Sequence, residues 1–199
     1  MSEIKSSGEK REFTTGSHRD ASTGKGRMDL LPASSVLKVM ATTTDLEKGL
    51  LMGHSKSFQY SDYLESALTS ALHYMKGDTD KDYLVLAARA AIIATGSFES
   101  LEATDEDKAK DVNNPIQCFA FGLKQLSKHY EAGAIKYGEN NWQLGQPMSV
   151  LMDSGMRHNA KAIAEITDEP HCRAAAWNYL CAIWTEENKP ELQNIASRK

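Results

Sequence analysis

Residues 63–75 read YLESALTSALHYM, and their pattern decides the fold class. The apolar side chains recur at three- and four-residue spacing, at Tyr63, Leu64, Ala67, Leu68, Ala71, Leu72 and Met75. This period places them on one face of an α-helix that packs against a core. Asp62 lies where an acidic residue favours the start of a helix, and Gly77 is a typical stop. The stretch therefore predicts an amphipathic helix between these two residues.

Helical patterns continue on both sides of this stretch. Toward the N-terminus, an apolar face opens after Pro32 with Val36, Leu37, Val39 and Met40. Toward the C-terminus, further helices are expected from about Asp80 to Thr95, from Pro115 to about Tyr137, from Pro147 to about Glu165, and onward from Asp168-Glu169-Pro170. No segment alternates with period two for long enough to be a convincing strand. The predicted fold class is all-α.

Length and composition are those of an ordinary globular protein. The chain has 199 residues, enough for one good-sized domain or two small ones, with 41% hydrophobic and 25% charged residues. Its formal charge of -4 lacks the basic excess of a nucleic-acid-binding surface. The longest apolar stretch, Tyr83 to Thr95, is interrupted by Arg89 and is too short to cross a membrane. The sequence therefore predicts neither a nucleic-acid partner nor a membrane partner.

The cysteines indicate a reducing compartment. Cys118, Cys172 and Cys181 lie far apart, form no CxxC pair and are odd in number. This arrangement favours free thiols over a disulfide framework or a zinc site, and buried cysteine packs as a small hydrophobe. The start of the chain is polar and lacks the apolar core of a secretory signal. We therefore expect a cytoplasmic protein whose cysteines are structural.

Composition and periodicity divide the chain into segments. Residues 1–35 form a basic N-terminal loop segment, and its first 27 residues have the composition of a flexible tail. Residues 36–98 and 115–187 carry the helical patterns. The acidic, polar stretch 99–114 has no apolar periodicity and is interpreted as a linker. Residues 188–199 are interpreted as a tail.

The two helical segments resemble each other. Residues Leu64–Ala94 can be laid on Met152–Ala182 without a gap. Upstream, with a shift of four residues, Glu47-Lys48-Gly49 meets Glu131-Ala132-Gly133. The order of the identities and the matching helix lengths predict an internal duplication.

The differences between the two copies single out a set of polar residues. The second copy has Arg157, His158, His171 and Asn178 where the first has Thr69, Ser70, Tyr83 and Ala90. The simplest account is one half that carries a site and one degenerate half that serves as scaffold. The degenerate half would then take the place of a partner subunit; a homodimer of the whole chain is the alternative.

Helical spacing pairs these polar residues. Asp153 and Arg157 are four residues apart and share a face, with His158 one position round. A surface ion pair is the structural alternative for the first two. His171 and Asn178 are seven apart, which is two turns, and a structural role is again the alternative. Polar groups of this kind are costly to bury unless they serve one another or a ligand.

The chemistry of the second copy suits a cation and phosphates. Carboxylates with an imidazole and an amide oxygen favour Mg²⁺ or Mn²⁺ over zinc, and such an ion can activate water for attack on phosphorus. Arg157 and Lys136 are candidates to neutralise phosphates. Trp142 or Trp177 is a candidate to stack on a base, with a core position for both as the alternative.

A basic, glycine-containing loop precedes the first helix. It holds Arg19, Lys25, Gly26 and Arg27. A loop of this composition can close over phosphates as a lid. It lacks the G-x-x-x-x-G-K-[ST] string of a Walker A loop.

Several strings together form a specific combination. They are Gly16...Arg19-Asp20...Gly24-Lys25-Gly26-Arg27...Asp29-Leu30-Leu31-Pro32, HYEAGAIKYG at 129–138 with Asn141-Trp142, Gly145 and Pro147, DSGMRH at 153–158, DEPH at 168–171 and AAWN at 175–178. They resemble the phage dATP/dGTP diphosphohydrolase family, which is similar to the all-α MazG-like nucleotide pyrophosphohydrolases. In that family the Leu-Leu-Pro segment passes directly to the H-Y-E-x-G helix, whereas residues 36–114 are inserted here. The resemblance implies two tandem MazG-like repeats in one helical bundle.

The resemblance also implies an activity and a set of roles. The activity is hydrolysis of a purine (deoxy)nucleoside triphosphate to the monophosphate and pyrophosphate, in the cytoplasm of an infected host cell. Mg²⁺ or Mn²⁺ would be held by Glu131, Asp153 and Asp168 or Glu169, with His158 and His171 as ligands or proton carriers. Phosphates would be held by Arg157, Lys136, Lys25, Arg27 and Arg19. Asn178 would orient a phosphate, a sugar or the water, and Trp142 would stack on the base.

Two alternatives to an enzyme stay open at this point. One is a protein that binds and sequesters a nucleotide without hydrolysing it. The other is a helical structural or interaction module in which the polar residues are remnants.

Overall fold

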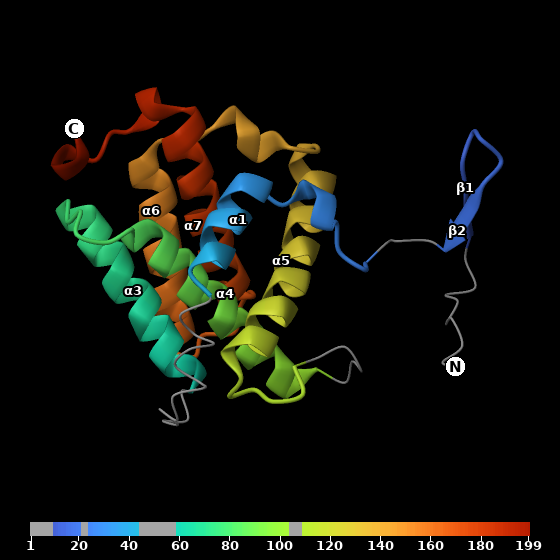
Figure 1. The fold of residues 1–199 in the computed structure, drawn as a ribbon, viewed down its shortest axis with the longest axis horizontal. Coiled ribbons are helices and arrows are strands. Elements are labelled where there is room, and N and C mark those ends of the chain that lie inside the picture. The colour runs from blue at the N-terminus through green and yellow to red at the C-terminus, as the bar shows by residue number, and fades with distance from the viewer. Residues whose placement is uncertain (1–9, 21–23, 44–58, 104–108) are drawn as a thin grey trace.

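The computed structural model of the chain describes residues 10–20, 24–43, 59–103 and 109–199, and helices dominate it (Figure 1). The helices are α1 (Ala33–Ala41), α3 (Tyr60–Lys76), α4 (Tyr83–Glu102), α5 (Pro115–Tyr137), α6 (Met148–Ile163) and α7 (His171–Asn188). Short 3₁₀ turns lie at Met28–Leu30, Asn141–Leu144, Pro190–Leu192 and Ala196–Arg198. The prediction of an all-α bundle is confirmed.

Helices α4 and α7 lie at the centre of the bundle (Figure 1). Helix α4 packs against α1, α3, α5 and α7, and α6 packs along α7. Helices α4 and α5 approach each other closely, and a Cβ atom added to Gly96 would lie 1.7 Å from the carbonyl oxygen of Cys118. A Cβ atom added to Gly122 would lie 2.1 Å from the carbonyl oxygen of Ile92. The two helices therefore meet backbone to backbone, which only glycine permits.

Local signals set the ends of several helices where the sequence predicts them. Gly77 ends α3 with φ 96°, a left-handed conformation that favours glycine. The Asn114 side chain accepts N–H bonds from Ile116 and Gln117 at the start of α5. The predicted bounds of α5 are confirmed, and those of α6 and α7 hold to within a few residues.

Helix α4 is longer than predicted. It continues past Thr95 to Glu102, into the stretch that the sequence assigns to a linker. The reason is tertiary, because Ser100 is buried and the Glu99 carboxylate is paired with Arg173 on α7. Among the described residues, α4 alone has the length and composition of a membrane span, and 72% of that stretch is buried inside the bundle. Its place in the core accounts for its apolar character.

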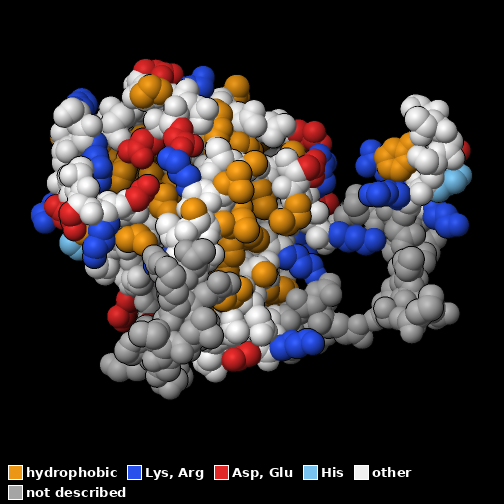
Figure 2. All heavy atoms as spheres, in the orientation of Figure 1, with side chains coloured by type: hydrophobic (Ala, Val, Ile, Leu, Met, Phe, Trp, Pro, Cys, Tyr) orange, Lys and Arg blue, Asp and Glu red, His pale blue; other side chains and the backbone are white. Residues whose placement is uncertain are grey.

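The apolar face of α1 is narrower than predicted. Val36 and Val39 are buried, but Leu37 and Met40 are 66% and 46% exposed. In a helix of nine residues, positions three apart share a face, and the other pair points away from the core. Figure 2 shows apolar side chains gathered in a band over the part of the surface where α1 and α5 lie.

The N-terminal segment contains a small hairpin, which corrects the prediction of a tail without strands. Strand β1 (Lys10–Glu12) pairs antiparallel with β2 (His18–Asp20), and Arg11 lies opposite Arg19. Gly16, with φ 77°, makes the turn possible, and its N–H donates to the carbonyl of Phe13. Strands of three residues are too short for alternation to reveal them.

The C-terminal segment, predicted as a tail, makes defined contacts with α3. Ile195 is buried, and the Arg198 guanidinium donates hydrogen bonds to the carbonyls of Tyr74 and Asp78. The same guanidinium lies 3.9 Å from the centre of the Tyr74 ring. These contacts attach the end of the chain to the bundle.

The helix bounds agree with the spacing of the predicted repeat. Moved by 88 residues along the chain, α3 would span 148–164 and α4 would span 171–190. The observed α6 and α7 span Met148–Ile163 and His171–Asn188. The upstream Glu47-Lys48-Gly49 match lies outside the described residues. The duplication itself stays a prediction.

Candidate functional site

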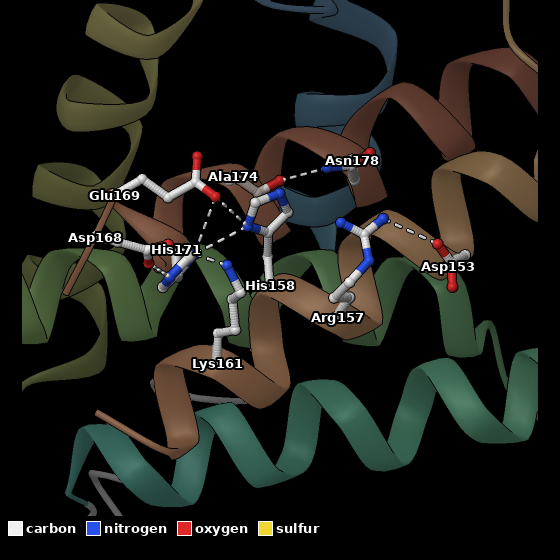
Figure 3. A network of polar contacts seen from close by, with 9 residues as sticks. All are labelled: Asp153, Arg157, His158, Lys161, Asp168, Glu169, His171, Ala174 and Asn178. Atoms are coloured by element: carbon white, nitrogen blue, oxygen red, sulfur yellow. Dashed lines mark hydrogen bonds and ion pairs between the residues drawn. The ribbon is translucent and has the colours of Figure 1, made fainter. Parts of the chain in front are cut away.

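The α6–α7 turn brings two imidazoles and a carboxylate together (Figure 3). His158 lies on α6, Glu169 in the turn, and His171 is the first residue of α7. The two Nδ1 atoms are 3.0 Å apart. Glu169 Oε1 lies 3.4 Å from Nδ1 of His158 and 3.5 Å from Nδ1 of His171. We call His158, Glu169 and His171 the His–Glu–His cluster.

A second carboxylate orients the cluster from outside. The Nε2 atom of His171 donates to Asp168 Oδ1 at 2.6 Å, and the Lys161 ammonium donates to Oδ2 of the same carboxylate at 3.2 Å. Both hydrogen bonds lower the pKa of Asp168, and the one from Lys161 has the larger effect. Because Nε2 of His171 donates to a carboxylate, its Nδ1 atom is the acceptor that faces His158 and Glu169. Asp168 therefore fixes the tautomer of His171.

Burial keeps the imidazoles of His158 and His129 neutral. Burial lowers the pKa of His158 and, together with the nearby Arg173, lowers the pKa of His129 to about 4. Both rings are thus uncharged at neutral pH and have a lone pair available on one nitrogen.

A pocket of about 880 Å³ opens beside the cluster and shares Glu169 and His171 with it. This volume lies in the range of small-molecule sites. Its walls come from α3, α4, α5, α6, α7 and the α6–α7 turn. The charged wall residues are Glu99, Glu102, Glu165, Glu169, Lys128 and Arg173. Acids exceed bases, so a polyphosphate would need cations to enter.

Residues that the sequence analysis missed form much of this wall. The Arg173 guanidinium donates two hydrogen bonds to the Glu99 carboxylate and a third to Gln125 Oε1 at 3.1 Å. Tyr60 and Phe98 stand edge to face in the same wall, with ring centres 5.5 Å apart. For Glu99 and Glu102 the sequence did contain a signal, the E-x-x-E string at 99–102, but that string lies in the stretch interpreted as a linker.

Two of the predicted site residues form an exposed ion pair. Arg157 donates to Asp153 at 2.9 Å, and their side chains are 55% and 72% exposed. This is the surface ion pair that the sequence analysis gave as the alternative to a functional role. Asn178 is buried, and its Nδ2 atom donates to the carbonyl of Ala174 on its own helix. The structure brings neither the pair nor Asn178 into a hydrogen bond with the cluster.

Glu131 lies with the N-terminal loop instead. Its two carboxylate oxygens accept N–H bonds from Gly24 and Gly26, each at 3.1 Å. Arg27 in the same loop is paired with Asp29 and Glu139. Lys25 is exposed. The predicted metal ligand and the predicted lid are therefore bound to each other.

The remaining predicted residues lie apart from the pocket. Arg19 is exposed in β2, and Lys136 is exposed with its ammonium 4.8 Å from the centre of the Tyr137 ring. Trp142 is 9% exposed and packs edge-on against Trp184 and Tyr130. Trp142 thus occupies the core position named above as the alternative to base stacking.

Comparison with known families places the segment that holds the cluster. Residues 102–195 match the family model described as dATP/dGTP diphosphohydrolase, N-terminal. The chain resembles this family. The diphosphohydrolase-like segment contains α5, α6 and α7 with the whole His–Glu–His cluster, while α1, α3 and nearly all of α4 precede it. The predicted resemblance is confirmed over these residues. Searches of curated proteins and of solved structures gave no match.

Proposed function

We propose that the protein hydrolyses purine deoxynucleoside triphosphates to the monophosphate and pyrophosphate, with a divalent cation, in the pocket beside His171. One observation carries the proposal. The pocket of about 880 Å³ and the His–Glu–His cluster share two residues, and both of these lie in the diphosphohydrolase-like segment. A pocket large enough for a small molecule and a candidate site for a cation are thus adjacent.

The reaction adds water across one bond. The water oxygen bonds to the α-phosphorus, the bond from that phosphorus to the bridging oxygen breaks, and pyrophosphate leaves with that oxygen. A bound divalent cation supplies positive charge to the phosphates and lowers the pKa of water. The guanidinium of Arg173, held by Glu99 and Gln125, contributes a fixed positive charge in the wall, and Lys128 contributes a second.

The donor atoms fit one of the two predicted ions better than the other. The cluster offers two imidazole nitrogens and one carboxylate oxygen. Mg²⁺ prefers oxygen ligands, whereas first-row transition-metal ions such as Mn²⁺ also accept imidazole nitrogen. Of Mg²⁺ and Mn²⁺, we therefore expect Mn²⁺ to support the higher activity.

Release of pyrophosphate is the direct test. The full chain is incubated with each of the four dNTPs and Mg²⁺ or Mn²⁺, and pyrophosphate and monophosphate are measured. We expect turnover of dATP or dGTP with Mn²⁺, and a loss of at least about a hundredfold in Glu169→Gln. Glu65→Gln, an exposed acid on α3, is the matched control and keeps its activity.

One outcome would overturn the proposal. Turnover of no nucleotide with either ion excludes the proposed hydrolase. If a nucleotide raises the melting temperature in that case, the protein is a nucleotide-binding one, because ligand binding stabilises by RT ln(1 + [L]/Kd).

A further inference from the structure

We propose that His158, Glu169 and His171 are the ligands of a first-row transition-metal dication such as Mn²⁺, Co²⁺ or Zn²⁺. The proposal deepens the proposed function, because it names the ligands and the class of ion for the same site. Of the four acids that the resemblance implies as ligands, it retains only Glu169, and it assigns His158 and His171, given there as ligands or proton carriers, as ligands.

The separations of the ligand atoms already match those around a bound ion. The three atoms lie within 4.8 Å of one another, and the pairs are 3.0, 3.4 and 3.5 Å apart. Ligands at about 2.0–2.2 Å from a metal ion lie about 3.3–3.6 Å apart at tetrahedral angles. An ion can therefore enter with shifts of a few tenths of an ångström.

Asp168 provides the outer contact that metal-binding histidines usually have. A histidine ligand commonly donates its other ring N–H to a carboxylate, which fixes the ring and its tautomer. The hydrogen bond of 2.6 Å from His171 Nε2 to Asp168 is such a contact, and Lys161 holds Asp168 in turn (Figure 3). Asp168 is thus a positioning residue and not a ligand.

The burial of the cluster favours a ligand between its members. The His171 side chain is 1% exposed and that of His158 is 14% exposed, and their Nδ1 atoms face each other. Two facing imidazole nitrogens can share only one proton between them, whereas a cation would accept a lone pair from both. Glu169 is 48% exposed, so the pocket side of the site stays open to water and phosphate.

Helices α3 and α4 form a pair that can be compared with α6 and α7, and this first pair lacks the proposed ligands. At positions 88 residues earlier, Ser70, Lys81 and Tyr83 replace the three cluster residues. The Tyr83 hydroxyl donates to Asp80 at 3.0 Å, as His171 donates to Asp168. The same ring-to-carboxylate contact thus forms in both helix pairs. In α3–α4, however, Ser70 and Tyr83 stand at the positions of the two cluster imidazoles, and the one imidazole nearby, that of His73, stacks on the Tyr83 ring. The substitutions His158→Ser, Glu169→Lys and His171→Tyr therefore replace each cluster residue with the one that stands 88 residues earlier in α3–α4.

Metal binding can be measured without any turnover. The untagged full chain, treated with a chelator, is titrated with Mn²⁺, Co²⁺, Zn²⁺ and Mg²⁺ by calorimetry, and Co²⁺ is also followed by its visible spectrum. We expect one equivalent of Mn²⁺, Co²⁺ or Zn²⁺ to bind at least tenfold more tightly than Mg²⁺. His171→Tyr and His158→Ser lower that affinity by at least about a hundredfold, and Asp168→Asn by about tenfold. Glu131→Gln and Asp153→Asn retain it.

Each result decides the question. Circular dichroism shows which variants fold. If a histidine variant does not fold, Asp168→Asn, which alters only the outer contact, provides the test instead. The proposed site would be overturned if the folded wild-type chain bound none of these metal ions. It would also be overturned if metal affinity were lost only in Glu131→Gln and Asp153→Asn. Metal binding without pyrophosphate release would support the site and remove the hydrolase. Hydrolysis that persists in His171→Tyr, together with an unchanged metal affinity of this variant, would keep the hydrolase and remove the site.

Discussion

Arg173 on α7 donates two hydrogen bonds to the carboxylate of Glu99 on α4, although 74 residues separate them in the chain. Their side chains are only 24% and 14% exposed. The pair joins the two central helices and lies in the wall of the pocket. Both the stability of the bundle and the charge of the pocket therefore depend on it.

Glu99→Gln should destabilise the fold. Removing one partner of a mostly buried pair leaves the other charge without compensation, at a cost of about 3 kcal/mol. Urea unfolding of the wild type and the variant measures this cost. Glu102→Gln, an exposed acid on the same helix, is the control and should change stability by less than about 0.5 kcal/mol. Equal effects of the two substitutions would contradict the prediction.

Gly26→Ala should release the N-terminal loop from α5. Gly26 has φ 92°, and an added Cβ atom would lie 2.1 Å from Ser127 Oγ. Release would break the hydrogen bond from Gly26 to Glu131 and free the backbone at Lys25 and Arg27, so that trypsin can bind and cleave it. Limited digestion with mass spectrometry measures cleavage at these two sites. Gly24→Ala is the matched control, because Gly24 also has positive φ, 76°, but no atom lies within 4 Å of its added Cβ. Similar cleavage rates in both variants would argue against a docked loop.

Acid should destabilise the protein through His129. Burial lowers the pKa of this residue to about 4, below its ordinary value of 6.5. Between these two values the unfolded chain binds the proton and the folded chain does not, so stability falls as the pH drops from about 6.5 toward 4. One such histidine lowers the free energy of unfolding by about 2 kcal/mol between pH 7.5 and pH 5. His158, whose pKa burial also lowers, adds an effect of the same sign.

Urea midpoints of the wild type and His129→Gln at these two pH values test this effect. The variant should lose less stability on acidification than the wild type. A pH dependence that is the same in both would exclude His129 as the source.

The cysteines should be unreactive in the folded protein. All three are free and buried, which agrees with the sequence interpretation of structural thiols. Burial raises the pKa of Cys118 to about 11 and those of Cys172 and Cys181 to about 12. The thiolate is the reactive form, so an aromatic disulfide reagent at pH 8 should label the native chain slowly and all three sites at once in urea. Rapid labelling of a native cysteine would show that its site opens.

The amino-acid sequence determined the elements that depend on neighbours along the chain. The spacing of Tyr63, Leu64, Ala67 and Ala71 specifies a helix, because α-helical packing repeats every 3.6 residues. Gly77 and Asn114 mark helix ends through their own backbone and side-chain hydrogen bonds. His158, Glu169 and His171 could be named from the sequence because one turn joins the helices that carry them.

Only the tertiary structure decided which polar groups meet. Glu131 was expected beside the other acids, but its partners are the N–H groups of Gly24 and Gly26, more than a hundred residues earlier. Trp142 belongs to the core, and Glu99 to the pocket wall. The helical period predicts which face of its own helix a residue occupies. It does not predict which other helix packs against that face, or which residues of that helix lie at the same level. Those relations depend on how whole helices pack, as in the backbone contact of Gly96 with Cys118, and they have no local pattern in the chain.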